Sequence, residues 1–163
     1  FTCLVLLPGR GRLHFVGFGP ERPALEQLAR DFNIADRVQF DGAISSEQMP
    51  AYLRQLDVLV LASRTLPNWK EQFGRILVEA MASEVAVVGA ESGEIPNVIG
   101  EAGLTFPEAD VESLRKQLLQ LMQSPELRYT LGRNGRLRAE AEFTQELVAA
   151  QTVAVYQQMM QKS

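Results

Sequence analysis

Residues 58–88, VLVLASRTLPNWKEQFGRILVEAMASEVAVV, contain a complete strand–helix–strand pattern. Val58–Leu61 is a continuous apolar run, which is typical of a strand buried on both faces of a parallel sheet. Every residue of 76–82 except Glu79 is apolar, so we expect a helix there that is buried on most of its faces. Residues 85–88 form the next apolar run. This unit predicts two parallel strands joined by a helical crossover.

The same alternation continues on both sides of this unit. Further strands are expected at residues 13–16, 37–40 and 103–106, and further helices at residues 23–32, 46–56, 111–123, 125–140 and 145–160. Ser46 is expected to cap the helix that it begins. Strands that alternate with helices predict an α/β fold, here a Rossmann-like parallel sheet with helices on both faces.

Composition limits the class of protein. With 163 residues, 46% of them hydrophobic and 22% charged, the chain has the balance of one globular domain with its own core. A net charge of −4 and the lack of a basic run argue against nucleic acid or an anionic membrane as a main partner. No apolar run reaches the length that crosses a bilayer. Cys3, the single cysteine, excludes an internal disulfide and suits a reducing compartment.

Two glutamates, Glu71 and Glu79, bracket the start of the expected helix with seven residues between them. In a largely helical segment they would lie about 12 Å apart along the axis, close enough for one ligand to touch both. A carboxylate in an apolar helix is costly unless it is hydrogen-bonded or functional. The alternatives are that Glu71 only complements the helix dipole and that Glu79 forms a buried ion pair.

Four candidate ligand segments each follow one of the first four expected strands. Ligands of open parallel sheets bind beyond the carboxyl ends of the strands, which is where these segments are expected. The candidate residues are Gly17 and Gly19 after the first strand, Gly42, Ala43 and Ile44 after the second, Lys70 and Glu71 after the third, and Ser92, Gly93, Glu94 and Ile95 after the fourth.

Phe73, Gly74 and Arg75 open the expected helix. Its free N–H groups favour a phosphate, and Lys70 and Arg75 can add charge-assisted contacts. The alternative for Arg75 is a solvated surface charge. The turn at Gly17 and Gly19 lacks the third glycine of a dinucleotide fingerprint, since position 22 is arginine, so we expect no nicotinamide or flavin cofactor.

Three other features have competing interpretations. Residues 92–95 can present polar groups to a sugar or form an ordinary helix-capping turn. His14, the only histidine, lies within a strand and is expected to be a hydrogen-bonded structural residue rather than a catalytic base. Trp69 can stack on a base or a sugar, or anchor its loop.

Together these segments resemble the C-terminal, nucleotide-sugar-binding domain of a retaining glycosyltransferase of the GT-B fold, glycosyltransferase family 4 (group 1). The resemblance covers nearly the whole chain. Its most specific element is the Glu71-x7-Glu79 signature with the following Ala80-Met81-Ala82. Supporting segments are residues 16–22, 37–42, 51–52, 57–58 and 124–128.

The resemblance implies roles for the candidate residues. Glu71 would lie beside the donor sugar and assist the transition state, and Glu79 would bind the ribose hydroxyls. The backbone at Phe73 and Gly74 would hold the diphosphate. The Gly42–Ile44 loop would meet the base, and residues 92–95 would meet the sugar. The co-substrate would be a UDP-, GDP- or ADP-sugar, with no cofactor and no metal.

The same resemblance implies a larger enzyme. The family's first strand, with its phosphate-binding Arg and Lys, and the N-terminal domain that binds a glycan or lipid-linked acceptor would precede Phe1. Segment 1–7, a strand by composition, would then end a helix. The whole enzyme would transfer a hexosyl group in polysaccharide biosynthesis, in the cytoplasm or at the cytoplasmic membrane face. The fragment alone would be inactive.

Several residues depart from the family pattern. Gln72 replaces a common glycine, and Glu94 and Asn97 replace the frequent glycine and glutamate of their loop. Two rival functions follow from the same fold. One is a GT-B-like nucleotide-sugar epimerase or hydrolase, and the other is a non-catalytic nucleotide-binding scaffold.

Overall fold

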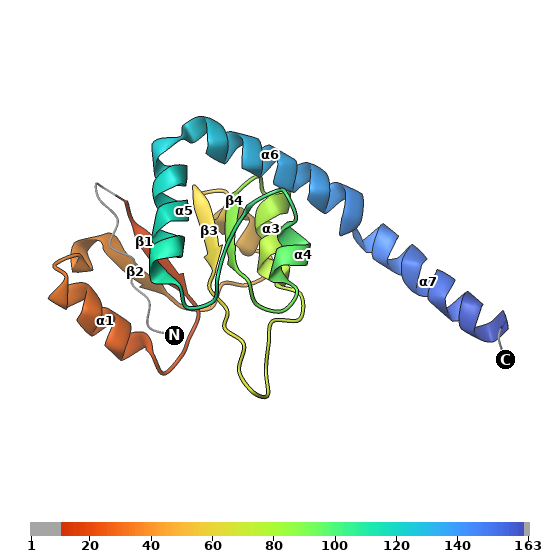
Figure 1. Ribbon diagram of the computed structural model, residues 1–163, viewed down its shortest axis with the longest axis horizontal. Helices are drawn as coiled ribbons and strands as arrows, with labels where there is room; N and C mark the ends of the chain where they lie inside the picture. Colours follow the sequence, from red (N-terminus) through yellow and green to blue (C-terminus); the bar gives the residue numbers. More distant parts are fainter. Residues whose placement is uncertain (1–10, 162–163) are drawn as a thin grey trace.

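The computed structural model describes residues 11–161, so the expectations for Cys3 and segment 1–7 lie outside the described residues. The strands are β1 (Leu13–Val16), β2 (Val38–Asp41), β3 (Val58–Leu61), β4 (Ala86–Ala90) and β5 (Leu104–Phe106). The helices are α1 (Arg22–Asp31), α2 (Met49–Leu53), α3 (Arg75–Ala82), α4 (Ile95–Ile99), α5 (Val111–Gln123), α6 (Pro125–Glu142) and α7 (Gln145–Gln161), with a 3-10 turn η1 at Ala35–Arg37. Figure 1 shows their arrangement.

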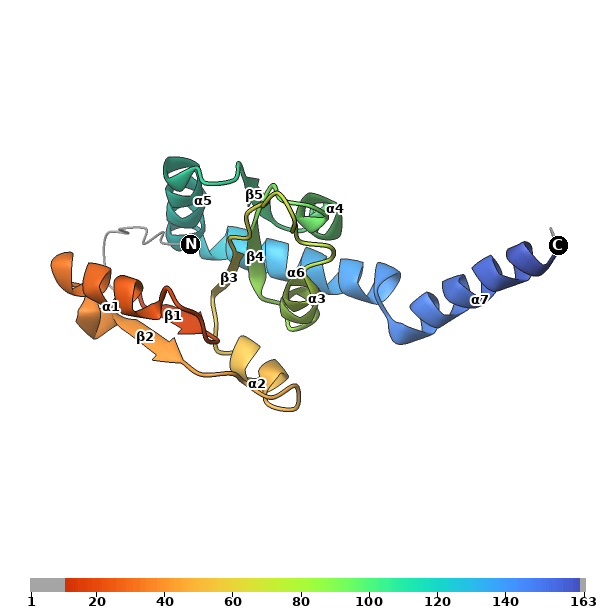
Figure 2. The ribbon, with the colours of Figure 1, turned by 90° about the horizontal axis from the view of Figure 1, so that it is seen from below.

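The expected parallel α/β architecture is confirmed, but the strands form two sheets instead of one. β1 pairs with β2 in one sheet, and β3, β4 and β5 pair in that order in the other. All pairs are parallel, with Leu13 opposite Val38 and Val58 opposite Ala86. Among the described residues no strand joins β1 to β3 (Figure 2). β3 is therefore an edge strand, and Val60 is exposed rather than buried on both faces as we expected.

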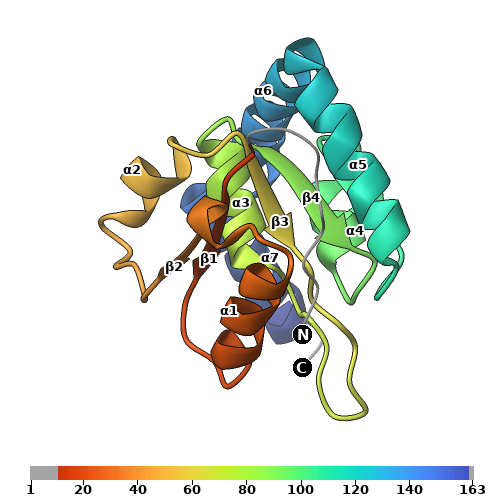
Figure 3. The same cartoon turned by 90° about the vertical axis from the view of Figure 1, so that its left-hand side faces the viewer.

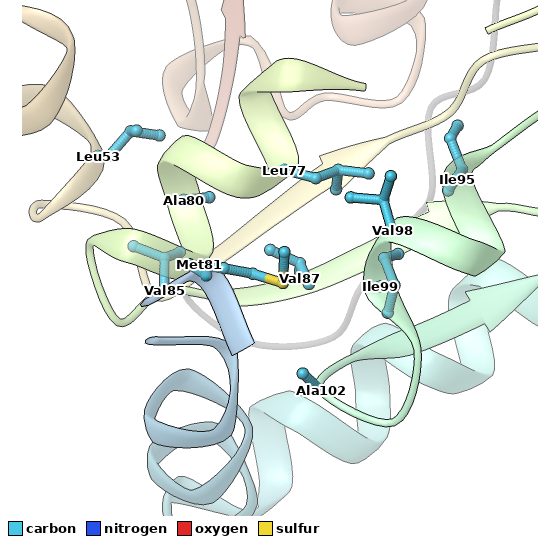
Figure 4. Packing of buried hydrophobic residues seen from close by; sticks show 11 residues of the cluster. Leu53, Leu77, Ala80, Met81, Val85, Val87, Ile95, Val98, Ile99 and Ala102 are labelled. Carbon is cyan, nitrogen blue, oxygen red and sulfur yellow. The ribbon is translucent and has the colours of Figure 1, made fainter. Parts of the chain in front are cut away.

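The core is built around β4, whose five residues are all buried. Val87 packs on one face with residues of α3 and α4, such as Met81 and Ile99 (Figure 4). Val88 packs on the other face with Leu114 of α5. Alternate side chains of a strand point to opposite faces, so β4 holds helices on both sides of its sheet.

The smaller sheet, formed by β1 and β2, packs against its own hydrophobic cluster. Ala29 of α1 and Ile34 pack against Leu13 and Phe15 of β1, and the rings of Phe15 and Phe40 stack 5.0 Å apart. Leu53 of α2 belongs instead to the main core beside α3. The chain between β2 and β3 therefore links the two sheets.

Several helix boundaries differ from the prediction. α2 covers only Met49–Leu53, and Ser45 rather than Ser46 bonds the turn before it, through its Oγ and the Gln48 amide at 3.3 Å. α4 and η1 were not predicted as helices. α4 buries Ile95, Val98 and Ile99, and this i, i+3, i+4 spacing was the available signal.

The last helix extends away from the rest of the domain (Figure 1). α6 packs against α3 and β4, whereas the described side chains of α7 from Val148 onward are exposed. None of the helices in the described part is both long and apolar enough to cross a bilayer.

Candidate functional site

Glu71 lies directly before α3 and folds back onto its first turn. Gly74, the residue before the helix, has a left-handed backbone with φ 72°, a conformation that glycine adopts without steric cost. The Gly74 amide donates to Glu71 Oε1 at 3.1 Å, and Ser63 Oγ donates to Glu71 Oε2 at 3.3 Å. The carboxylate is thus held at the positive end of the helix.

The loop after β4 rests against Glu71. The Glu94 amide donates to the Glu71 carbonyl oxygen at 3.1 Å. A Cβ atom on Gly93, whose φ is 55°, would lie 1.8 Å from the same oxygen. Two segments that the sequence singled out separately, at Glu71 and at Gly93–Glu94, are therefore adjacent at the carboxyl ends of β3 and β4.

Glu79 is not buried as we expected. Its side chain is 39% exposed and pairs with Arg75 one turn earlier, with 3.3 Å between Oε1 and Nε. Leu77, Ala80 and Met81 face the core, so Glu79 and the 84% exposed Arg75 share the outer side of α3. An exposed pair of this kind stabilises a helix by only about 0.3–0.5 kcal/mol. Both groups are accessible to a ligand.

Within the 92–95 segment, two side chains are buried and two residues are accessible to solvent. The Ser92 and Ile95 side chains are fully buried. Ser92 Oγ lies 3.1 Å from Thr65 Oγ1, and Ile95 belongs to the core beside Leu77. Only Gly93 and Glu94 present surface to a ligand here.

A second group of candidate residues lies at the carboxyl ends of β1 and β2. The Gly17 amide donates to the Asp41 carbonyl oxygen at 3.2 Å. A Cβ on Gly42 would meet the exposed Phe18 ring at 3.2 Å, so the turn at Gly17–Gly19 lies beside the Gly42–Ile44 loop. Ala43 is exposed and Ile44 is partly buried.

A network that the sequence analysis did not find supports this second group. Tyr52 Oη donates to Asp41 Oδ2 at 3.1 Å, and His14 Nδ1 lies 3.0 Å from Tyr52 Oη. Burial and the bond to Asp41 raise the pKa of Tyr52 to about 12. The hydrogen bond from Gln39 holds the pKa of Asp41 below its ordinary value, despite partial burial. His14 is hydrogen-bonded, as predicted for a structural histidine.

Thr65 and Glu108 join the loops after β3 and β5. Thr65 donates to both Glu108 oxygens, from Oγ1 at 2.5 Å and from its amide at 2.8 Å. These bonds lower the pKa of Glu108 below its ordinary value. Glu108 follows the fifth strand, so the same argument from strand ends could have identified it.

The remaining candidates, Lys70 and Phe73, lie on the loop before α3. Lys70 is exposed. The ring of Phe73 meets the ring of Phe143 edge-on at 5.7 Å, between α6 and α7. Within residues 11–161, no three His, Cys, Asp or Glu side chains are grouped to hold a metal ion.

This arrangement is suited to an anionic ligand with a polar, hydroxyl-rich part. The first-turn amides of Arg75 and Ile76 have no acceptor within the helix, whereas that of Gly74 is bonded to Glu71. Glu71 lies before α3 and Glu79 lies on its second turn, and each carboxylate can accept hydrogen bonds from a ligand. The geometry thus combines phosphate donors with two carboxylates.

Comparison with known proteins places the chain in context. The model of a family described as glycosyl transferases group 1 matches residues 10–138. The chain is 38% identical over 136 residues to an MMP alpha-(1->4)-mannosyltransferase of Mycolicibacterium hassiacum, covering 81% of this chain and 32% of that protein. It is 30% identical over 149 residues to a GDP-mannose-dependent monoacylated alpha-(1-6)-phosphatidylinositol monomannoside mannosyltransferase of Corynebacterium glutamicum, covering 90% and 39%.

A solved structure agrees with this similarity. Sucrose-phosphate synthase from Thermosynechococcus elongatus superposes with a TM-score of 0.79 at 32% identity, over 94% of this chain and 39% of that one. The chain therefore spans about a third of the length of its relatives, between 32% and 39% in the three named.

Proposed function

The chain belongs to the group 1 family of glycosyl transferases, and we propose that it forms the donor-binding part of a retaining hexosyltransferase. The observation that carries the proposal is the junction of Glu71, the start of α3 and Gly93–Glu94 at the carboxyl ends of β3 and β4. Ligands of open parallel sheets bind at such an edge.

The proposed donor is a nucleoside diphosphate sugar. One relative carries GDP-mannose dependence in its name, and UDP- and ADP-sugars offer the same diphosphate and ribose groups. The Arg75 and Ile76 amides would receive the diphosphate, with Arg75 and Lys70 adding positive charge. The ribose hydroxyls would bond to Glu79, which lies accessible beyond the first turn of α3.

The reaction would break the bond between the sugar and the diphosphate. Charge that develops on the leaving phosphate would be stabilised by the helix amides, which are already oriented. Glu71, fixed by Gly74 and Ser63, would stand beside the sugar as positive charge develops there. The acceptor hydroxyl oxygen would bond to the anomeric carbon on the face that the diphosphate leaves, and its proton would pass to the leaving phosphate oxygen, so that the anomeric configuration is retained.

The acceptor, a glycan or a lipid-linked sugar, would be bound by another part of the protein. The chain spans only 32% of the mannosyltransferase that it resembles. We further propose that a strand from that other part pairs between β1 and β3, whose facing edges are unpaired among the described residues. The 163-residue chain alone would then bind donor weakly and not transfer sugar.

Calorimetry with UDP, GDP, ADP and their sugars tests the proposal on the protein that carries this chain. One nucleotide should bind, and Glu79→Gln should weaken it by roughly 10- to 100-fold, the value of a hydrogen bond to a charged group. NMR of the transfer product should show the anomeric configuration of the donor.

The matched control is Glu101→Gln, an exposed glutamate between α4 and β5. It should leave nucleotide affinity unchanged. Equal affinity in wild type and Glu79→Gln would reject the ribose role. Failure of every nucleotide to bind the whole protein would reject the proposed function itself.

A further inference from the structure

The loop between β3 and α3 has a closed turn at its tip, which projects beyond the strand ends (Figure 3). Leu66 and Trp69 form an antiparallel bridge, in which the Leu66 amide donates to the Trp69 oxygen at 2.7 Å and the Trp69 amide donates back at 3.2 Å. Pro67 and Asn68 occupy the tip. We name residues 65–70 the Trp69 turn.

Both ends of the Trp69 turn are anchored to the candidate site. At its start, Thr65 bonds to Glu108 and to the buried Ser92. After its end, Glu71 is held by the Gly74 and Glu94 amides. A turn that is closed internally and fixed at both ends can present side chains with little loss of conformational entropy on binding.

The side chains of the turn suit a sugar. Leu66 and Trp69 are 46% and 48% exposed. Residues 65–70 and Gln72 line an open surface depression of about 490 Å³. It combines the indole with the Asn68 amide, the Lys70 ammonium and the Gln72 amide. A pyranose has an apolar C–H face for the ring and hydroxyls for the polar groups.

We propose that the Trp69 turn binds a sugar unit of the acceptor. Lys70, at the end of the turn, directly precedes Glu71, the residue assigned to the donor sugar, so the turn leads into the proposed reaction centre. The indole ring covers one face of the acceptor sugar, and the Asn68 and Gln72 amides bond its hydroxyls. This inference rests on the proposed function and adds an acceptor contact within the donor-binding part.

Two other occupants would give different results. The donor nucleobase could stack on Trp69, in which case nucleotide alone would change its environment. Another part of the protein could cover the turn, in which case neither nucleotide nor sugar would reach it.

Trp69 is the only tryptophan of these 163 residues, and the part of any fluorescence change that Trp69→Phe abolishes reports on this site. Methyl α-glycosides of mannose, glucose, galactose and N-acetylglucosamine are titrated, with and without UDP or GDP, into the protein that carries this chain. At least one glycoside should give a saturable change. Saturation-transfer NMR with that glycoside should show roughly 10-fold weaker binding for Trp69→Ala, with Trp69→Phe in between.

The matched control is Tyr129→Ala, which removes an exposed aromatic ring from α6. It should leave glycoside binding unchanged, and circular dichroism should confirm that each variant is folded. The inference is overturned if no glycoside changes the fluorescence, if only nucleotide does, or if Trp69→Ala binds glycoside normally. Calorimetric nucleotide binding distinguishes the two proposals. If only the acceptor inference is wrong, the protein still binds nucleotide. If the proposed function is wrong, it binds none.

Discussion

At the scale of single residues, the position of Glu71 depends on Gly93. The Glu71 carbonyl oxygen accepts from the Glu94 amide at 3.1 Å and lies where a Cβ of residue 93 would be. The left-handed backbone of Gly93 adds a second reason for glycine, since other residues are strained there. A side chain at this position would push apart the loops after β3 and β4.

Gly93→Ala should therefore destabilise the protein by about 2–3 kcal/mol, in the range for strained and crowded sites. It should also weaken nucleotide binding, because Glu71 and the start of α3 move. Urea unfolding and calorimetry measure the two effects. Gly11→Ala is the control, because a Cβ there meets only the flexible end of Met122, at an ordinary contact distance of 3.6 Å. Equal stability of the two variants would show that the loops separate without cost.

At the scale of elements, the close packing of α6 against α3 fixes the position of α3. A Cβ on Gly132 of α6 would lie 2.2 Å from the Glu84 oxygen, just after α3, and one on Gly135 would lie 3.1 Å from Met81. Glycine inside a helix normally costs about 1 kcal/mol relative to alanine. Its presence here allows the close approach of α6 to the C-terminal end of α3.

Gly132→Ala should destabilise the protein by about 1–3 kcal/mol, against the gain expected from helix propensity. The reason is that backbone atoms at Glu84 cannot move aside as a flexible side chain can. Thermal unfolding measures the change. The control is Asn134→Ala at an exposed position of α6, which should be neutral or stabilising by about 0.5 kcal/mol. A stabilising Gly132→Ala would contradict the close contact.

At the scale of the whole molecule, the unpaired edges of β1 and β3 separate the two halves of the site. The Gly17–Gly19 turn and the Gly42–Ile44 loop belong to the β1–β2 sheet, whereas Glu71 and Gly93 belong to the β3–β5 sheet. Within the described residues the sheets are connected through α2 and its flanking loops. A strand between them would fix the distance between the proposed base and phosphate contacts.

Hydrogen exchange tests this proposal by comparing the 163-residue chain with the longer protein expected to carry it. Amides of β1 and β3 should exchange markedly more slowly in the longer protein, because strand pairing protects them. Amides of β4, already paired on both sides, serve as the internal control and should differ little. Equal exchange of β1 and β3 in both proteins would exclude the additional strand.

Much of the fold could be predicted from the sequence. Short, mostly apolar segments located β1 and β3, and the helices expected at residues 111–123 and 125–140 correspond to α5 and α6. The site was predicted only in part. Glu71 and Gly93 were named separately, and their contact could not be predicted, because it joins residues from different loops. The contacts of Thr65 and Tyr52 were missed for the same reason, whereas Glu108 could have been identified from its place after the fifth strand.

The sequence by itself determined the order of strands and helices, the parallel class of the sheet and the edge at which the candidate residues lie, because these follow from local periodicity and chain direction. Only the tertiary structure decided which side chains are accessible. It turned Glu79 outward beside Arg75, buried Ser92 and bonded Glu71 to the amide of Gly74. Those outcomes depend on how helices pack on the sheet, and packing involves residues that are distant in the chain.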